Sequence, residues 1–402
     1  MKKFLISIIL LTVAVPIFAC TSAIISGRVT PDGRPLMWKN RDTNNPKNCV
    51  IYLKGEKYDY IAVSAANYAS VKAIWMGTNN QGFCIMNTLS YNLSNSEEER
   101  NTSQNGSLMK RALEICASIE DFKNFIDTLS KRNVEANYGV IDAMGGAAYF
   151  EVGSTDYKIF DVNNPEVAPK GYLVRSNYSV SGNKKTGKGY LRYLRSEQAI
   201  DTALTRKSIN PQWFFNTLSR SFCNPLTGEN LPYTDTKLES PDWRIDQDYI
   251  ARSKSVSAVV FQGIKKGENP DFTIMWTSIG YPVVTPAVPL WVKGASERLP
   301  ESVIKNKKIN NSLLAEVGTA KRDEVFSYHV GSESEKYFNW DLLFNTKGNG
   351  YMQNAIAIEN EIFSHSATII KKLRKKRELS TKKVFELYDW IDSFLSSKYE
   401  EF

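Results

Sequence analysis

The chain has 402 residues, of which 42% are apolar and 23% charged, a composition typical of a globular protein and not of a disordered or fibrous one. With only two histidines, His329 and His365, a multi-histidine metal centre or a histidine-based catalytic triad has very few candidate residues. The five cysteines include no CxxC pair, which argues against zinc, iron–sulfur and thioredoxin-type chemistry.

Residues 1–19 have the features of a secretory signal peptide. Lys2 and Lys3 precede an apolar run of about a dozen residues, shorter than the roughly 20 that a bilayer-crossing helix needs, and Ala19 suits the residue before a cleavage point. Prolines interrupt the next most apolar stretch, 281–292. We expect an exported protein, periplasmic or extracellular, without stable membrane insertion.

The charge of the chain does not indicate a nucleic-acid partner. The formal net charge of +8 falls to +6 when Lys2 and Lys3 are removed, and no basic stripe is interleaved with aromatic residues. The one dense basic run, 371–377, ends an amphipathic helical pattern, where cations complement the helix dipole. We interpret it as a solvated helix end.

Cleavage after Ala19 would make Cys20 the first residue of the mature chain, and two interpretations compete. Cys20 could be the acylated cysteine of a lipid-anchored binding protein, because residues 17–20 have the aliphatic and small residues of a lipobox. Alternatively, Cys20 is a nucleophile whose own α-amine serves as the base. An α-amine has a pKa of roughly 7.7 to 8.0 and a cysteine thiol about 8.5, so the two exchange a proton readily and need no histidine.

The residues after Cys20 predict a hairpin. Residues 20–25 are small and β-branched, as in a strand, and Pro, Asp and Gly in 30–35 indicate a turn before a second strand. A hairpin of this length returns the polar cluster 39–42 towards the level of Cys20.

Cys20-Thr21, followed after a hairpin by Lys39-Asn40-Arg41-Asp42, resembles the start of the cysteine N-terminal nucleophile (Ntn) hydrolases of the linear amide group. This group includes choloylglycine hydrolases, penicillin V acylases and acyl-coenzyme A:6-aminopenicillanate acyltransferases. The resemblance implies that Asp42 orients the Cys20 amine. Lys39 stands where the group has arginine, and a lysine cannot form a bidentate fork. Either Lys39 or Arg41 could supply the positive charge.

Two asparagines match the group's oxyanion residues in order. Residues 77–83 resemble its Gly-x-Asn-x-x-Gly-Leu turn, and the resemblance implies that the side chain of Asn87 beyond it is one oxyanion donor. Residues 174–178 resemble the segment whose asparagine completes the oxyanion pocket, which makes Asn177 the second candidate. One such donor contributes roughly 2.7 to 4 kcal/mol in comparable sites.

A last match opens a predicted helix. Residues 189–193 resemble the group's Arg-Tyr motif near the active site, with Arg192 as the better match and Arg195 as the alternative. The cluster of cations could also favour a substrate carboxylate, and we expect Arg41 and Arg175 to contribute to substrate binding.

The remaining elements predict mixed α and β structure. Strands are expected at 50–53, 60–64, 73–76, 83–88, 257–262 and 272–277, a hairpin at 137–152, and helices at 107–130, 189–204, 311–327, 351–377 and 381–399. The resemblance covers roughly 20–292 and implies an α+β fold of four layers (αββα), in which two antiparallel sheets pack face to face and helices flank them. We expect one domain over 20–402, with its core at about 20–300 and a helical extension at about 301–402.

The resemblance also implies the chemistry. The Cys20 thiolate would attack the carbonyl of a small-molecule amide, and water would hydrolyse the thioester, with no metal or organic cofactor. Lipidation would remove the amine as a base, so an exported amidohydrolase is favoured over a lipid-anchored binding protein, with an acyltransferase of the same fold as the alternative. The sequence does not identify the amide, the oligomeric state or the disulfide state of Cys49, Cys84, Cys116 and Cys223.

Overall fold

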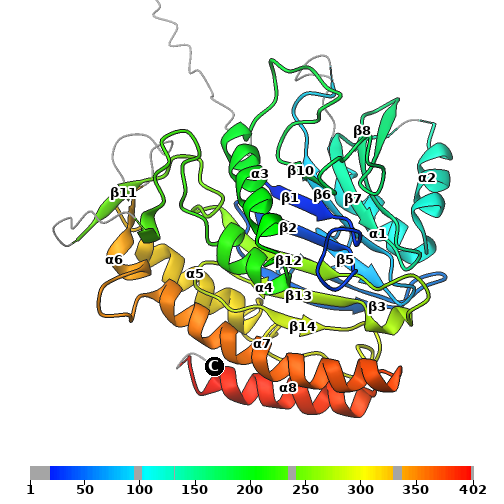
Figure 1. The fold of residues 1–402 in the computed structure, drawn as a ribbon. Helices are drawn as coiled ribbons and strands as arrows, with labels where there is room; N and C mark the ends of the chain where they lie inside the picture. The colour runs from blue at the N-terminus through cyan, green and yellow to red at the C-terminus, as the bar shows by residue number, and fades with distance from the viewer. Residues whose placement is uncertain (1–18, 95–101, 131, 234–240, 329–336, 400–402) are drawn as a thin grey trace, which may run out of the picture.

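The computed structural model describes residues 19–94, 102–130, 132–233, 241–328 and 337–399 (Figure 1). The predicted signal peptide, apart from Ala19, and His329 lie outside the described residues.

One sheet is built around the hairpin predicted after Cys20. Strands β1 (Thr21–Ile25) and β2 (Leu36–Asp42) pair antiparallel and form the centre of a six-stranded sheet with the order β10-β1-β2-β12-β13-β14. The other four strands come from later in the chain: β10 (Tyr172–Arg175), β12 (Ser255–Gln262), β13 (Ile274–Ile279) and β14 (Val288–Leu290).

The second sheet is an antiparallel meander of seven strands in chain order, β3 to β9. Its strands are β3 (Asn48–Leu53), β4 (Tyr60–Ala65), β5 (Met76–Asn79), β6 (Cys84–Leu89), β7 (Ala136–Ile141), β8 (Ala147–Val152) and β9 (Tyr157–Asp161). The strand predicted at 73–76 lies three residues further along the chain, at Met76–Asn79. A Cβ on Gly77 would meet Leu113 of the covering helix at 2.7 Å, so close packing requires a glycine inside this strand and weakens its apolar pattern.

The helix predicted at 107–130 is two helices, α1 (Asn105–Ile115) and α2 (Ile119–Asp127). The break lies at Ser118, which forms a reciprocal capping box with Asp121. This N-cap starts a new helix inside a continuous apolar pattern, because it satisfies the backbone N–H groups of a first turn.

The two sheets face each other, since β1 contacts β6 and β8 while β2 contacts β7. Helices α1 and α2 cover the outer face of the seven-stranded sheet through an apolar cluster of their own. On the outer face of the other sheet lie α3 (Tyr190–Thr205), α4 (Pro211–Trp213) with the π-helical turn Phe214–Ser219, and α7 (Tyr351–Lys376) (Figure 1). The predicted four-layer α+β fold of two antiparallel sheets flanked by helices is confirmed.

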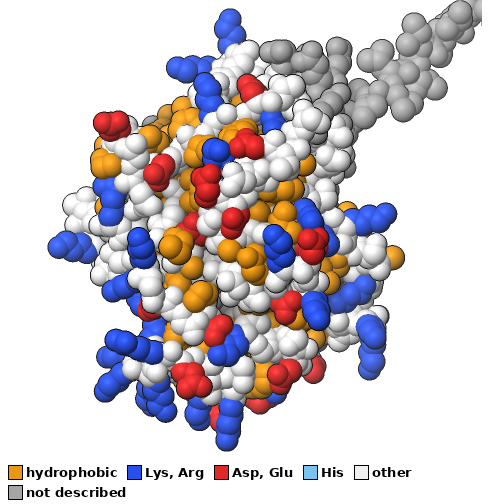
Figure 2. All heavy atoms as spheres, turned by 90° about the vertical axis from the view of Figure 1, so that its right-hand side faces the viewer, with side chains coloured by type: hydrophobic (Ala, Val, Ile, Leu, Met, Phe, Trp, Pro, Cys, Tyr) orange, Lys and Arg blue, Asp and Glu red, His pale blue; other side chains and the backbone are white. Residues whose placement is uncertain are grey.

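The C-terminal helices are α5 (Leu313–Val325), α6 (Trp340–Leu343), α7 and α8 (Thr381–Ser396). Apolar residues of α5, α7 and α8 join the same core cluster as both sheets. A two-stranded ribbon, β11 (Trp243–Ile245) with β15 (Tyr337–Asn339), was not predicted. In Figure 2, Lys and Arg side chains are most numerous on the lower part of the face, where Figure 1 places α7 and α8.

Within the described ranges, no helix combines the length and hydropathy required to cross a membrane. The same residues contain no group of three or more His, Cys, Asp or Glu side chains arranged to hold a metal ion. All five cysteines are buried free thiols.

Candidate active site

The hairpin brings Cys20 beside the predicted polar cluster. Thr21 pairs with Asn40 and Ser22 with Lys39, so Cys20, one residue before β1, lies at the level of Arg41. Cys20 is 7% exposed and every residue of β2 is buried. The sequence cluster thus becomes a buried polar region in the middle of a sheet.

Successive side chains of β2 point to opposite faces, as in any strand. Lys39 contacts Asn87 of the opposite sheet, whereas Trp38 donates to Ser219 under the helical layer. By alternation Arg41 shares the inter-sheet face with Lys39, while Asp42 lies on the helix-facing side. The side chains of residues 39–42 therefore lie in two different environments, one between the sheets and one under the helices.

Lys39 is held by the seven-stranded sheet. Its Nζ donates to the Asn87 Oδ1 at 3.0 Å and to the Trp75 carbonyl oxygen at 2.8 Å. Because Asn87 accepts through its oxygen, its NH₂ group remains the donor end, as the predicted oxyanion role requires. Burial lowers the pKa of Lys39 to about 8, and the nearby Cys20 thiolate partly opposes this.

Arg41 lies beside the same thiol. One Nη donates to the Asn48 Oδ1 at 2.7 Å, and the guanidinium carbon sits 4.4 Å from the centre of the Trp75 ring. Burial lowers the pKa of Arg41 to about 10, and the Cys20 thiolate again opposes the effect. Among the described residues, no carboxylate forms an ion pair with Lys39 or Arg41. Of these two cations, Lys39 contacts an oxyanion candidate and Arg41 does not, which favours Lys39 for the role of the group's arginine.

Arg192, on the first turn of α3, reaches the backbone of Cys20. Its Nη1 donates to the Cys20 carbonyl oxygen at 2.7 Å and to the Thr21 hydroxyl at 2.8 Å, and its Nη2 donates to the Asn177 Oδ1 at 2.8 Å. Gly189 has a left-handed φ of 83°, and a Cβ there would clash with the Arg192 guanidinium, so a glycine is required before this helix. Arg195, the alternative candidate, donates instead to Ser221.

Asn177 uses both ends of its amide. The oxygen accepts from Arg192 and the NH₂ group donates to the Leu89 carbonyl oxygen at 2.9 Å. In this arrangement Asn177 holds Arg192, and donation to a substrate oxyanion would require the bond to Leu89 to break. Its oxyanion role stays a prediction.

Asp42 is 2% exposed and accepts at Oδ1 from the Ser255 hydroxyl at 2.8 Å and from the Asn40 amide at 3.1 Å. Its Oδ2 lies 3.3 Å from the Nε of Arg252. Burial raises the pKa of Asp42 to about 6, against the lowering effect of Arg252 and Arg192. In the full-length chain the Cys20 nitrogen is the amide of the Ala19–Cys20 peptide, so the contact of a free amine with Asp42 stays a prediction.

The structure does not bring Arg175 to this cluster. Arg175 pairs in register with Ser22, and its Nε lies 2.7 Å from the Glu151 Oε1, with both side chains almost fully buried. Glu151 also accepts from the backbone N–H groups of Val180 and Ser181. We therefore correct the substrate-binding role of Arg175: its charge is already satisfied in a structural ion pair between the two sheets.

Sequence reasoning missed Ser255, Asp248 and Arg252, which surround Asp42 and Arg192. Ser255 opens β12 and pairs with Asp42 across more than two hundred residues of chain. The only local signal is the i, i+4 spacing of Asp248 and Arg252, which form an ion pair.

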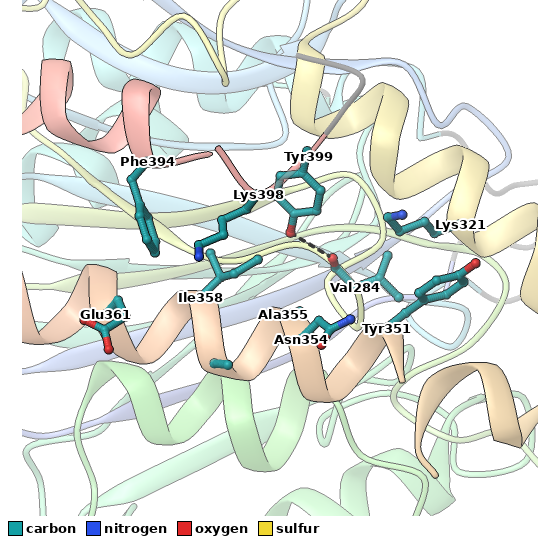
Figure 3. Close-up of a pocket in the computed structure, with 11 residues that line it drawn as sticks. Val284, Lys321, Tyr351, Asn354, Ala355, Ile358, Glu361, Phe394, Lys398 and Tyr399 are labelled. Carbon is teal, nitrogen blue, oxygen red and sulfur yellow. Dashed lines mark hydrogen bonds between the residues drawn. The ribbon is translucent and has the colours of Figure 1, made fainter. Parts of the chain in front are cut away.

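A separate pocket of about 560 Å³ lies between α5, α7 and the end of α8 (Figure 3). Lys321, Tyr351 and Ile358 line it together with Phe394 and Lys398. None of the predicted site residues lines this pocket, so it is distinct from the Cys20 cluster.

Residues 29–214 match the family model described as acyl-coenzyme A:6-aminopenicillanic acid acyl-transferase. The match includes Lys39, Asp42, Asn87, Asn177 and Arg192 and begins after Cys20. It confirms the resemblance to Ntn hydrolases predicted from the ordered motifs. The class of reaction that it indicates is amide hydrolysis or acyl transfer.

Comparison with solved structures finds similar chains at low sequence identity. The chain is 14% identical to a Caenorhabditis elegans N-acylethanolamine-hydrolyzing acid amidase ortholog, with 62% of this chain and 93% of that one covered and a TM-score of 0.41. It is 14% identical to a mutant of the Clostridium perfringens conjugated bile acid hydrolase (68% and 92% covered, TM-score 0.39) and 11% identical to the Agrobacterium tumefaciens penicillin V acylase (68% and 86%, TM-score 0.36). No curated protein matches the chain.

Proposed function

We propose that this protein is an exported amidohydrolase that cleaves a linear amide C–N bond through a thioester on Cys20, after residues 1–19 are removed. The observation that carries the proposal is the buried cluster around Cys20: Arg192 on its carbonyl oxygen, and Lys39 and Asn87 on the inter-sheet side. These three side chains come from separate parts of the chain and gather around the residue that a signal peptidase would expose.

In the proposed mechanism the free α-amine of Cys20 takes the proton of its thiol, and the thiolate attacks the amide carbonyl carbon. The charge that develops on the carbonyl oxygen is stabilised by the NH₂ group of Asn87. When the C–N bond breaks, the ammonium returns the proton to the leaving nitrogen. Water, deprotonated by the same amine, then attacks the thioester carbon and releases the carboxylic acid and the thiol.

The anionic thiolate explains why two cations are buried without carboxylate partners. Lys39 and Arg41 both lie close enough to Cys20 for the thiolate to oppose the loss of their charge. A substrate carboxylate could use the same positive field, which supports Arg41 as a substrate-binding residue.

Intact mass of the secreted chain, followed by assay of Cys20 variants, tests the proposal. We expect a mature chain that begins at an unmodified Cys20, hydrolysis of one or more acyl amides by this chain, and a folded but inactive Cys20→Ala variant. Retention of most of the activity in Cys20→Ala would contradict the mechanism. A diacylglyceryl mass on Cys20 would instead support the lipid-anchored binding protein.

Acyl transfer is a second candidate, favoured by the description of the matching family model. Both reactions share the thioester and differ in whether water or an amine attacks it. Addition of an acceptor amine, with mass spectrometry of the products, separates them: an acyltransferase would form the new amide faster than the free acid.

A further inference from the structure

A chain of alternating charges runs along the helix-facing side of β1 and β2. It begins at Asp42, passes through Arg252 and Asp248 and ends at Arg192, which binds the carbonyl oxygen of Cys20. We propose that Arg252 and Asp248 are positioning residues that hold Asp42 and Arg192 in place around Cys20. The proposal rests on the proposed function of Cys20 and goes beyond it, since neither residue lies in a motif of the resembled group.

Strand pairing places Arg252 next to Asp42. Arg252 lies three residues before β12, whose first residue, Ser255, pairs with Asp42 in the sheet. The Nε of Arg252 donates to the Tyr249 carbonyl oxygen at 3.2 Å and lies 3.3 Å from the Asp42 Oδ2. The Arg252 side chain is 13% exposed and the Asp42 side chain 1%, so little water screens the pair.

Asp248 joins the two arginines. Its Oδ1 accepts from Arg252 and from the Nε of Arg192, the latter at 3.2 Å. Asp248 has a left-handed φ of 59°, which is unfavourable for a residue with a Cβ. Its backbone N–H is fixed by the carboxylate of Asp246 at 3.1 Å. The loop thus holds an unfavourable conformation in which a single carboxylate oxygen bridges both guanidinium groups.

At the other end of this chain of charges, Arg192 contacts the proposed nucleophile, Cys20. Its three remaining contacts are the Cys20 carbonyl oxygen, the Thr21 hydroxyl and the Asn177 oxygen. A shift of Asp248 would therefore move the backbone of Cys20, while a shift of Arg252 would act on Asp42.

The charges around Asp42 give the two residues opposite electrostatic effects. Arg252 and Arg192 lower the pKa of Asp42, and Asp248 raises it. Lys39 and Arg41 interact with Asp42 from the same strand, Tyr281 lies within electrostatic reach of Asp42, and Asp246 lies within reach of Arg252. Removing Arg252 should raise the pKa of Asp42, whereas removing the charge of Asp248 should lower it.

The test compares mature Arg252→Gln and Asp248→Asn proteins with the unchanged one. Asn keeps a side-chain oxygen at the position that accepts from both arginines, so Asp248→Asn removes the charge and preserves the acceptor. Arg252→Lys, which retains the charge, is the conservative variant. Arg244→Gln is the matched control, because Arg244 pairs with Asp242 and not with Asp42.

The readout is the pH dependence of Cys20 alkylation by iodoacetamide, measured by mass spectrometry of the N-terminal peptide, alongside kcat/KM for an acyl p-nitroanilide that the enzyme hydrolyses. We expect the acidic limb of both profiles to move up by about one pH unit in Arg252→Gln, because an opposite charge at this distance lowers a carboxyl pKa by roughly 1 to 3 units. The limb should move down in Asp248→Asn and stay in place in Arg252→Lys and Arg244→Gln.

A purely structural role would move both variants in the same direction or leave both limbs unchanged, and either result would overturn the proposal. If Arg252→Gln does not fold, Asp248→Asn and Arg252→Lys still decide, because only the first should shift the limb. Failure of the proposed function looks different: Cys20 would then be alkylated no faster than the four other buried cysteines, whatever the loop variant.

Discussion

At the scale of single residues, the site departs most from the group it resembles at Lys39. A lysine at this position holds Asn87 with one bond and carries a charge that can be lost, whereas an arginine would stay charged. With the pKa of Lys39 lowered to about 8 by burial, its ammonium form is present below that pH and disappears as the pH rises through it. If the proposed function is right, we expect the loss of this charge to limit activity at alkaline pH.

We expect Lys39→Met to reduce kcat/KM about 100-fold or more, because it removes both the charge beside the thiolate and the bond that orients Asn87. Lys39→Arg should retain more activity than Lys39→Met and move the alkaline limb of the kcat/KM profile to higher pH. The exposed Lys54→Met serves as the control. An unchanged alkaline limb in an active Lys39→Arg enzyme would rule out Lys39 as the titrating group.

Arg41 should decide whether the site prefers an anionic substrate. For a hydrolysed N-acyl amino acid, we expect Arg41→Met to raise KM about 10- to 100-fold, the loss expected from one charge-assisted hydrogen bond. The matching N-acyl alkylamine, which lacks the carboxylate, should be affected much less. Steady-state kinetics on both compounds measures the difference, and equal losses on the two would assign Arg41 to the thiolate alone.

At the scale of elements, caps decide boundaries that apolar periodicity cannot. In α2, Ser118 and Asp121 satisfy each other's backbone groups and separate this helix from α1. Ser118→Ala should lower the free energy of unfolding by about 1 kcal/mol, as typical N-cap losses do. Chemical denaturation measures the change, with Thr202→Ala on the exposed side of α3 as the control. A stability equal to that of the control would mean that α2 does not depend on this cap.

Structure that depends on neighbouring residues could be predicted from the sequence, and structure that depends on distant residues could not. The hairpin after Cys20 and the helices α5, α7 and α8 follow from residues close in sequence, so turn chemistry and periodicity predicted them. Arg252 could not be predicted, because it reaches Asp42 only when β12 pairs with β2. Arg175 was misassigned since a motif gives the position of a residue but not its partner: Glu151 of the opposite sheet meets Arg175 only when the two sheets pack face to face.

At the scale of the whole molecule, the helices after residue 300 complete the fold and are not an appendage. Arg220, which follows the π-helical turn, lies inside the helical layer with a side chain 1% exposed. Its Nη1 and Nη2 donate to the two carboxylate oxygens of Glu359 on α7, at 2.8 and 2.9 Å. Glu359 also accepts from the backbone N–H of Ala287 at 2.9 Å. The buried Glu359 carboxylate thus binds α7 to two other segments of the core, at Arg220 and at Ala287.

Removal of this carboxylate should therefore destabilise the entire protein. In Glu359→Ala the Arg220 guanidinium would stay buried without its partner, which typically costs about 3 to 5 kcal/mol. Urea unfolding followed by fluorescence measures the loss, and Glu361→Ala, an exposed glutamate on the same helix, should stay within about 0.5 kcal/mol of the unchanged protein. If α7 were only loosely attached, Glu359→Ala would unfold like the control and limited proteolysis would release the C-terminal helices. A single cooperative transition, shifted as a whole, would instead show that α7 and the two sheets unfold together.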